Sequence, residues 1–415
     1  MTCSCSRRDF LARGLYGIGL GTGLPVFLSR TSAALTAQAL QGTSMERHPE
    51  RILVVLELSG GNDGLNTVVP HGDPAYYRAR PHIGVPVREV LKVSDHFGFH
   101  PSMVGFERLY KDGRMAIVHG CGYDHPSLSH FSSMSYWHTG VPNAGEALGW
   151  LGRLADDHLD PATRNLIVNI GTSQSLAVRS GKHSPLVFDD PARFRRDGTD
   201  DEKHVLAALG GDSAKSSNST LDFLAATARN ATDSSDFVRQ ASASYRTPVD
   251  YGIGNAFGGG LQRVAALINA GMKTRLYYVA YQGNAFDTHV QQGDVHSRLL
   301  MYTADAVRAF LDDIARIGRA DDVAVMMFTE FGRRVEENGS LGTDHGTATP
   351  MFLFGKHVKG ALYGQPPSLT DLDDGNLKMT TDFRRVYATA IKEWLGYDDT
   401  DAVLKGRFDT LAAFT

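Results

Sequence analysis

Side chains that can bind metal ions or act as nucleophiles occur in five separate segments of this 415-residue chain, each beside an apolar run. The candidates are Asn62, Asp63, Ser127, Ser129, His130, Asp287, His289, Glu330, Arg333, Arg334, Asp344 and His345. Carboxylate oxygens and imidazole nitrogens are the usual ligands of Zn²⁺, Mn²⁺ and related ions. A bound metal lowers the pKa of water or a hydroxyl and offsets the charge of an anionic substrate. The pattern predicts a metal site at which an anionic ester is hydrolysed.

Within this set the residue types indicate different roles. Ser127 or Ser129 would be the nucleophile beside the metal, and His130 would act as acid or base. Arg333 and Arg334 are suited to holding a phosphate or sulfate group in bidentate fashion. The third candidate for substrate binding is Asn62, at the end of an apolar run.

Each segment also has an ordinary structural interpretation. Asn62 and Asp63 could only shape a turn, and Ser127 could cap a helix. Arginines such as Arg333 and Arg334 are more often solvated than bound to a ligand. The occurrence of all five segments at the ends of apolar runs favours the joint functional interpretation.

The elements that must position these side chains are predicted from the apolar pattern. Continuous apolar, often β-branched runs predict strands over residues 52–56, 114–119, 165–170, 275–281, 323–328 and 351–354. Helical spacing predicts helices over residues 103–110, 261–268, 295–317 and 382–394. The alternation predicts an α/β domain with a mainly parallel sheet between helix layers. Ligands of such sheets bind beyond the carboxyl ends of the strands, where the polar segments lie.

Composition excludes some classes of protein. Apolar residues make up 42% of the chain and charged residues 21%, as in ordinary globular proteins. The net charge of -4 gives no reason to expect nucleic acid as a partner. The segment over residues 195–247 is rich in Ser, Asp, Thr, Asn and Ala. It predicts a peripheral helical or partly disordered insertion in a single domain over residues 40–415. It could instead cover the site.

The N-terminal residues have the three parts of a twin-arginine export signal. Arg7 and Arg8 precede Phe-Leu, an apolar stretch diluted by glycine covers residues 15–28, and an Ala-x-Ala step ends at Ala39. The stretch is too short to span the roughly 30 Å of a bilayer core, and no transmembrane segment is expected in the mature chain. We therefore expect a signal peptide over residues 1–39, the twin-arginine translocase as a transient partner, and a periplasmic or secreted protein that folds before export.

Five motifs that follow one another along the chain carry a resemblance to a known family. They cover residues 58–67, 126–131, 286–289, 329–334 and 342–346. They resemble the markers of the bacterial domain of unknown function family 1501, which is grouped with the alkaline phosphatase and sulfatase superfamily. The resemblance covers essentially the whole mature chain. It implies an alkaline-phosphatase-like three-layer α/β sandwich with a metal site at the strand ends.

The resemblance also implies roles for single residues. Ser127 matches the nucleophile that opens a helix in the superfamily, and Ser129 is the second match. Asp287 and His289 fit an Asp and a His that bind one metal ion, and His345 fits the last His of that ion. The metal candidates implied as a set are Asp63, Asp287, His289, Glu330, Asp344 and His345.

Three departures from the superfamily pattern leave two functions open. Phe331 stands in a motif that usually supplies ligands for a second metal, the step from Asp287 to His289 is short, and Asp63 is displaced from the strand end. One hypothesis is an exported hydrolase of phosphate, sulfate or related esters that uses Zn, Mn or Ca, with one ion instead of two. Its substrate would be a small anionic ester or an envelope polysaccharide. The alternative is a non-catalytic exported envelope or binding protein.

Overall fold

The computed structural model describes residues 48, 50–160, 163–194, 233–252 and 254–415. The predicted signal peptide and residues 195–232 of the predicted insertion lie outside this part of the chain. The rest of the predicted insertion begins with a helix over residues 233–244. Within the described residues, no helix has the length and apolar character needed to cross a membrane.

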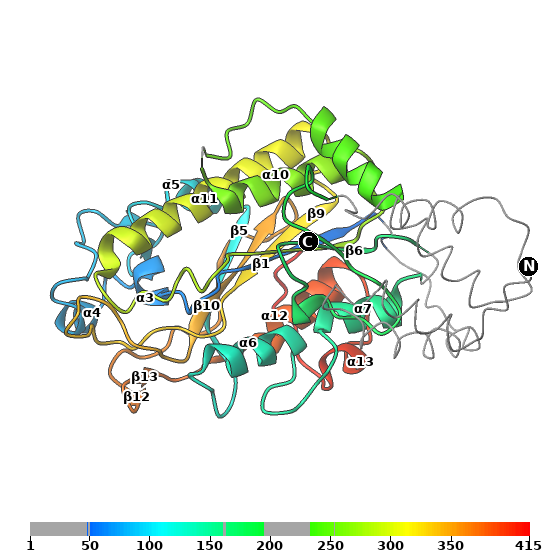
Figure 1. The fold of residues 1–415 in the computed structure, drawn as a ribbon. Coiled ribbons are helices and arrows are strands. Elements are labelled where there is room, and N and C mark those ends of the chain that lie inside the picture. Colours follow the sequence, from blue (N-terminus) through cyan, green and yellow to red (C-terminus); the bar gives the residue numbers. More distant parts are fainter. Residues whose placement is uncertain (1–47, 49, 161–162, 195–232, 253) are drawn as a thin grey trace, which may run out of the picture.

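A large sheet forms the centre of the molecule (Figure 1). Its strand order is β11 (Leu362–Tyr363), β5 (Met115–Gly122), β10 (Thr349–Gly355), β9 (Val323–Phe328), β1 (Ile52–Glu57), β8 (Leu276–Ala280), β6 (Ile167–Ile170) and β7 (Leu186–Phe188), and β14 (Thr381–Asp382) also pairs with β5. Only β10 runs antiparallel to its neighbours among the described strands of this sheet. The prediction of a mainly parallel sheet is confirmed.

The apolar runs are continuous because both faces of the sheet are buried. In β1, Ile52, Val54 and Leu56 pack into one hydrophobic core, while Leu53 and Val55 pack into the other. All six predicted strands are present, with ends that differ by at most a few residues.

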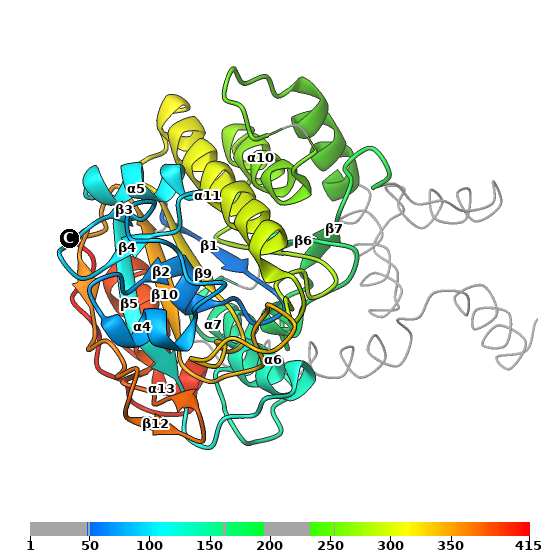
Figure 2. The same cartoon turned by 90° about the vertical axis from the view of Figure 1, so that its left-hand side faces the viewer.

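Helices cover the two faces of the sheet, as Figures 1 and 2 show. One layer contains α5 (Val104–Lys111), α10 (Ala256–Asn269) and α11 (Gln292–Arg316). The other contains α6 (His130–Thr139), α7 (Trp150–His158), α12 (Phe383–Thr389), the π-helical turn η3 (Ala390–Trp394) and α13 (Asp401–Leu404). The three-layer α/β sandwich is confirmed.

Short elements that the apolar pattern did not predict lie outside the main sheet. They are α3 (Gly64–Thr67), α4 (Pro74–Ala79), η2 (Leu176–Val178), the small sheet of β2 (Val68–Val69), β4 (Gly98–Phe99) and β3 (Leu91–Lys92), and the pair β12 (Leu372–Asp373) and β13 (Asn376–Leu377). Segments of two to six residues are too short to show a hydrophobic period.

A buried carboxylate on α11 holds the chain that follows the predicted insertion. Asp313 accepts hydrogen bonds from the hydroxyls of Tyr245, Thr247 and Tyr251 at 2.7, 2.7 and 2.9 Å, and from Nε of Arg316 at 2.8 Å. Its side chain is fully buried. Burial alone would raise the pKa of this carboxyl, but the four donors outweigh that effect and lower it. The segment over residues 245–251 is therefore tied to the helix layer.

Candidate metal centre

Loops at the carboxyl edge of the sheet bring the candidate residues together. The loop after β1 carries two glycines with positive φ, Gly60 at 117° and Gly61 at 73°. A Cβ on Gly60 would lie 2.5 Å from the backbone nitrogen of Asp287, and one on Gly61 would overlap the ring of Phe331. Only glycine allows this close approach, which places the loop after β1 against the loops after β8 and β9.

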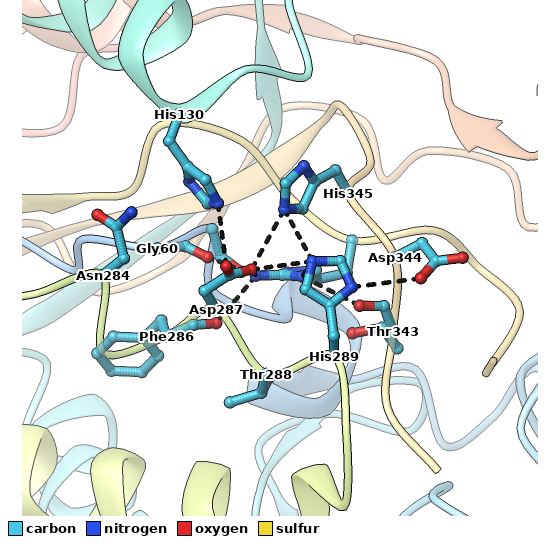
Figure 3. A network of polar contacts seen from close by, with 12 residues as sticks. Gly60, His130, Asn284, Phe286, Asp287, Thr288, His289, Thr343, Asp344 and His345 are labelled. Carbon is cyan, nitrogen blue, oxygen red and sulfur yellow. Dashed lines mark hydrogen bonds and ion pairs between the residues drawn. The ribbon is translucent and has the colours of Figure 1, made fainter. Parts of the chain in front are cut away.

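Three ligand atoms from separate loops lie within 4.8 Å of one another, and they belong to His130, Asp287 and His345. Nε2 of His130 is 3.4 Å from Oδ2 of Asp287, and Nε2 of His345 is 3.2 Å from Oδ1. Figure 3 shows both imidazoles turned toward the Asp287 carboxylate from the same side. This group combines the first residue of α6, the β8–α11 loop and the segment before β10.

His289 adds a third imidazole to this group. Its Nε2 lies 3.0 Å from Oδ1 of Asp287 and 2.9 Å from Nε2 of His345. The two rings are 4.7 Å apart, and the view in Figure 3 has His289 on the side of Asp287 away from His130. The predicted pair Asp287 and His289 thus lies next to the predicted His345.

The other ring nitrogen of each histidine is held by an acceptor. Nδ1 of His130 lies 2.8 Å from Oε1 of Glu330, and Nδ1 of His345 lies 2.8 Å from the carbonyl of Leu128. Nδ1 of His289 lies 3.3 Å from Oδ1 of Asp344. A carbonyl or an ionised carboxylate can only accept, so each Nδ1 donates and each neutral ring presents the lone pair of Nε2.

This arrangement fits a divalent metal ion. Nε2 of His130 is buried without a hydrogen-bond partner among the described residues. Nε2 of His289 and Nε2 of His345 lie 2.9 Å apart, with Nη1 of Arg333 3.3 Å from the first. Either a proton or a cation between the two nitrogens would relieve the repulsion of their lone pairs. Burial lowers the pKa of His345 and disfavours the proton. Ligand atoms of a tetrahedral Zn²⁺ site are roughly 3.3 Å apart, close to the spacings around Asp287.

Glu330 and Asp344, both predicted as metal ligands, instead contact the Nδ1 atoms of His130 and His289. Glu330 is fully buried and accepts hydrogen bonds from the backbone nitrogen of Gly60 at 2.9 Å and from the hydroxyl of Thr329 at 2.9 Å, in addition to His130. The hydrogen bond that His130 donates to Glu330 is the main cause that raises the pKa of His130. Asp344 is largely exposed and also accepts from Asn338 at 3.0 Å. Both carboxylates orient imidazoles.

Asp63 and Asn62 belong to a separate buried network. Asp63 forms an ion pair with Arg80 at 2.7 Å and accepts from Gln292 at 2.6 Å. Burial alone would raise the pKa of Asp63, but Arg80 and His296 outweigh this and lower it. The Asn62 side chain contacts Nε2 of His296 at 2.9 Å and Thr67 at 2.9 Å. These hydrogen bonds hold the side chains of Asn62 and Asp63 away from His130, His289 and His345.

Arg333, predicted to bind substrate, has its guanidinium donors directed at the protein. It donates to the carbonyls of Gly60, Gly61, Phe286 and Thr343 and to Oδ1 of Asp287, the last at 2.7 Å. Its Nη1 also lies 3.3 Å from Nε2 of His289. Its side chain is fully buried. Burial alone would raise the pKa of Asp287, but the contact with Arg333 is the principal effect that lowers it. Arg334 instead points to Asp374, with 3.5 Å between the charged groups.

The predicted nucleophiles lie in the loop that precedes α6. Ser127 does not open the helix, because α6 begins at His130 and Ser129 is its N-cap residue. Oγ of Ser127 accepts from the backbone nitrogen of Ser129 at 3.3 Å, and its own nitrogen donates to Tyr123 at 3.0 Å. The same loop contributes the Leu128 carbonyl to His345, so both serines lie in the chain segment that borders the histidine group.

Phe331 covers one side of this group. Its ring is 4.9 Å from that of His130 and 4.8 Å from that of His345. Beyond it, a cavity of about 210 Å³ is lined by residues 122–126, by Glu330 and Phe331, and by residues 377–379. Phe331 therefore places an apolar ring against two of the imidazoles, at the sequence position where ligands of a second metal were expected.

Sequence reasoning missed several residues that hold the site. Leu128 acts through its backbone carbonyl, so its side-chain type carries no signal. Gln292 bridges Thr288, Thr343 and Asp63 from the first turn of α11, and its contacts depend on the tertiary fold. In the sequence, only its position three residues after His289 could have indicated that Gln292 lies near the site.

The fold and the site together define a mixed α/β protein with a candidate metal centre of histidines and carboxylate at the carboxyl edge of its sheet. The chain belongs to the family described as Protein of unknown function (DUF1501), whose model matches residues 50–406. The family that the five motifs indicated is therefore confirmed. A comparison with curated proteins finds no match.

Several solved structures resemble the chain loosely. The PsFucS1 sulfatase from Pseudoalteromonas sp. has 12% identity and a TM-score of 0.36, with 92% of this chain and 76% of that chain covered. The C-terminal periplasmic domain of EcEptC from Escherichia coli, in complex with Zn, has 11% identity and a TM-score of 0.36, covering 88% and 90%. A protein in the alkaline phosphatase superfamily from Vibrio parahaemolyticus has 9% identity and a TM-score of 0.34, covering 81% and 70%. Likeness at this level assigns no property of these proteins to the chain.

Proposed function

We propose that this protein is an exported metal-dependent hydrolase of phosphate, sulfate or related esters that uses one divalent ion. The observation that carries the proposal is the convergence of three imidazoles on Asp287. Nε2 atoms of His130, His289 and His345 lie 3.4, 3.0 and 3.2 Å from its carboxylate oxygens. Each ring also has an acceptor at Nδ1, the arrangement that metal-binding histidines commonly have.

The ligands in this proposal are His130, Asp287, His289 and His345, with Zn, Mn or Ca as candidate ions. His130 changes from an acid-base candidate to a ligand, because its Nδ1 is engaged by Glu330 and its Nε2 faces Asp287. Nitrogen ligands favour Zn or Mn over Ca. Phe331 supports a single ion, because its ring packs against two of the imidazoles.

The chain's own residues would orient the ester and the attacking group. A bound divalent ion would supply Lewis-acid chemistry, lowering the pKa of a nearby hydroxyl and offsetting the charge of the ester. Ser127 is the proposed nucleophile, because it lies in the loop whose Leu128 carbonyl contacts His345, and Ser129 is the second candidate. Arg333 holds Asp287 and the three surrounding loops in place, so its role is to position the site.

Metal analysis is the decisive experiment. Purified mature protein should contain about one equivalent of Zn or Mn, and His345→Ala should lose it while remaining folded. His357→Ala is the matched control, because His357 lies in another part of the molecule beside Asp321. A metal-free wild-type protein, or equal metal content in His345→Ala, would refute the proposed centre.

Turnover then separates the hydrolase from the alternative, a non-catalytic envelope or binding protein. Metal-loaded protein is assayed with aryl phosphates, aryl sulfates and phosphodiesters, alongside Ser127→Ala and Ser129→Ala. We expect one serine variant to lose turnover and keep its metal. Metal-loaded wild type that hydrolyses none of these esters would instead favour the binding protein, an outcome supported by the hydrogen bond that Ser127 Oγ already accepts.

Export is tested separately. The Arg7-Arg8 pair and the Ala-x-Ala step at Ala39 support twin-arginine export and a periplasmic or secreted location. Changing both arginines to lysine should leave the protein in the cytoplasmic fraction of cells that export the natural chain. Unchanged fractionation would refute the proposed route.

A further inference from the structure

The most exposed large apolar side chains in the described part of the chain lie beside the histidines of the site. Phe131 is 87% exposed and directly follows His130, and Val290 is 63% exposed and directly follows His289. Two further exposed residues, Leu128 at 36% and Leu341 at 38%, stand nearby. We call these four residues the apolar rim.

The rim belongs to two parts of the structure that also carry or contact the histidines of the site. Leu128 and Phe131 belong to the loop and first turn of α6, and the carbonyl of Leu128 contacts His345 at 2.8 Å. Val290 and Leu341 belong to two segments joined by backbone hydrogen bonds of 2.9 Å from Gln291 to Ser340 and from Gln292 to Leu341. His345, whose Nδ1 contacts the first part, and His289, which precedes Val290 in the second, have ring centres 4.7 Å apart.

Exposed apolar side chains grouped around a polar site indicate ligand contact. Single exposed apolar residues are ordinary on any protein surface. Contiguous groups with a polar surround instead mark binding sites, and small-molecule sites combine apolar walls with a few polar groups. Here the polar groups are the imidazoles and Asp287, and the walls are the rim.

The charges around the site disfavour a polyanionic polymer. Arg333 is fully buried with its donors engaged, and Arg334 faces Asp374. Asp344 keeps 57% of its side chain exposed beside His289. A sulfated or phosphorylated polymer has many charges to neutralise, and these two arginines are not placed to do so.

We propose that the ester bound here carries an apolar alkyl or aryl group, and that this group lies on the apolar rim. This inference rests on the proposed function and narrows its substrate class from anionic esters, including polysaccharides, to amphipathic ones. The charged ester group would lie at the histidines, and the apolar group would contact Phe131 and Val290. Each buried methylene contributes about 0.8 kcal/mol, which corresponds to roughly a fourfold gain in affinity.

The test compares methyl and hexyl esters of phosphate and sulfate with metal-loaded protein, below the concentration at which the hexyl esters form micelles. With five additional methylenes partly buried, kcat/KM should be about a hundredfold higher for the hexyl ester. The double variant Phe131→Ser with Val290→Ser should reduce this preference to about tenfold or less, with little change for the methyl ester. Equal kcat/KM for the two esters, or an unchanged preference in the double variant, would overturn the inference and leave the hydrolase intact.

A control variant and a binding measurement complete the test. Phe237→Ser removes a phenylalanine with 36% exposure that lies beside Thr163–Asn165, before β6 and thus at the opposite edge of the sheet. It should keep the full hexyl preference. Calorimetry with methyl and hexyl phosphonate, which cannot be hydrolysed, gives an affinity ratio that does not depend on turnover. If no ester is hydrolysed but hexyl phosphonate binds more tightly through the rim, the proposed function fails while the apolar subsite stands.

The apolar group could belong to a soluble ester or to a lipid. Monomeric hexyl phosphate and vesicles of phosphatidylcholine with phosphatidic acid distinguish these sources. Turnover of the first alone identifies a soluble ester, and turnover of the second identifies a lipid. Turnover of neither, in a protein that hydrolyses methyl phosphate, would refute the proposed substrate class.

Discussion

Replacing Glu330 by Gln tests whether this residue prepares His130 for a metal ion. Oε1 of Glu330 lies 2.8 Å from Nδ1 of His130, and the same carboxylate accepts from Gly60 at 2.9 Å and Thr329 at 2.9 Å. Gln has a single acceptor oxygen, so its NH₂ group must face one of these donors. His130 would then lose its fixed orientation or the charge that favours its Nδ1 proton.

The expected loss of metal affinity follows from the contact of Glu330 with Nδ1 of a proposed ligand, His130. Removing such a partner commonly lowers metal affinity about 10- to 100-fold, or about 1.4 to 2.7 kcal/mol. Zinc affinity is measured by competition with a chromophoric chelator, and thermal unfolding shows whether the apo variant is folded. Asp344→Asn should have a smaller effect, because Asp344 is exposed and its contact with His289 is longer, at 3.3 Å.

The matched control is Glu336→Gln, which changes an exposed carboxylate in the segment that follows. It should bind zinc like the natural protein. If folded Glu330→Gln binds zinc within twofold of the natural protein, then the carboxylate does not orient a ligand and the reasoning about Nδ1 is wrong.

Three further substitutions examine the supports of the site and the fold. Gly60→Ala should destabilise the protein by about 1–3 kcal/mol in urea unfolding and reduce its metal content, because φ is 117° and the added Cβ meets the Asp287 backbone at 2.5 Å; full metal occupancy and stability would contradict this. Arg333→Met should destabilise by about 3–5 kcal/mol, because it leaves Asp287 and buried carbonyls without a donor, whereas a stable variant with only a raised KM would restore its predicted role in substrate binding. Asp313→Asn should cost about 1.5–3 kcal/mol at pH 7. Since the folded pKa of Asp313 is depressed, its contribution to the free energy of unfolding is present above the unfolded pKa of about 3.9 and is lost as pH falls through the folded value. The stabilities of natural protein and variant should therefore converge in acid. A stability difference that does not depend on pH would refute the ionic role.

The sequence allowed the main sheet, the long helices and the edge that holds the site to be predicted. Runs such as residues 323–328 are buried on both faces and therefore continuous in sequence. Asp287, His289 and His345 were predicted as neighbours from a resemblance, and the structure places them together. Their binding of metal stays a prediction.

The residue types alone could not predict which polar side chains form the candidate metal centre and which ones hold other residues in place. Asp63 and Asp287 are both carboxylates after strands, yet Asp63 pairs with Arg80 and Asp287 faces three imidazoles. Arg333 looked like a substrate ligand because its sequence does not reveal that backbone carbonyls surround it. These differences arise from contacts across the fold, on which a local pattern carries little information.

The contacts that shape the candidate centre join residues far apart along the chain. His130 and Glu330 are separated by 200 positions, and Gly60 and Glu330 by 270. Contacts with such long loops form late in folding, because their closure entropy must be overcome first. A nascent or partly folded chain would therefore lack the selective site and offer only scattered imidazoles to any ion. Any metal ion in the purified protein would then be one that was available in the compartment where folding was completed.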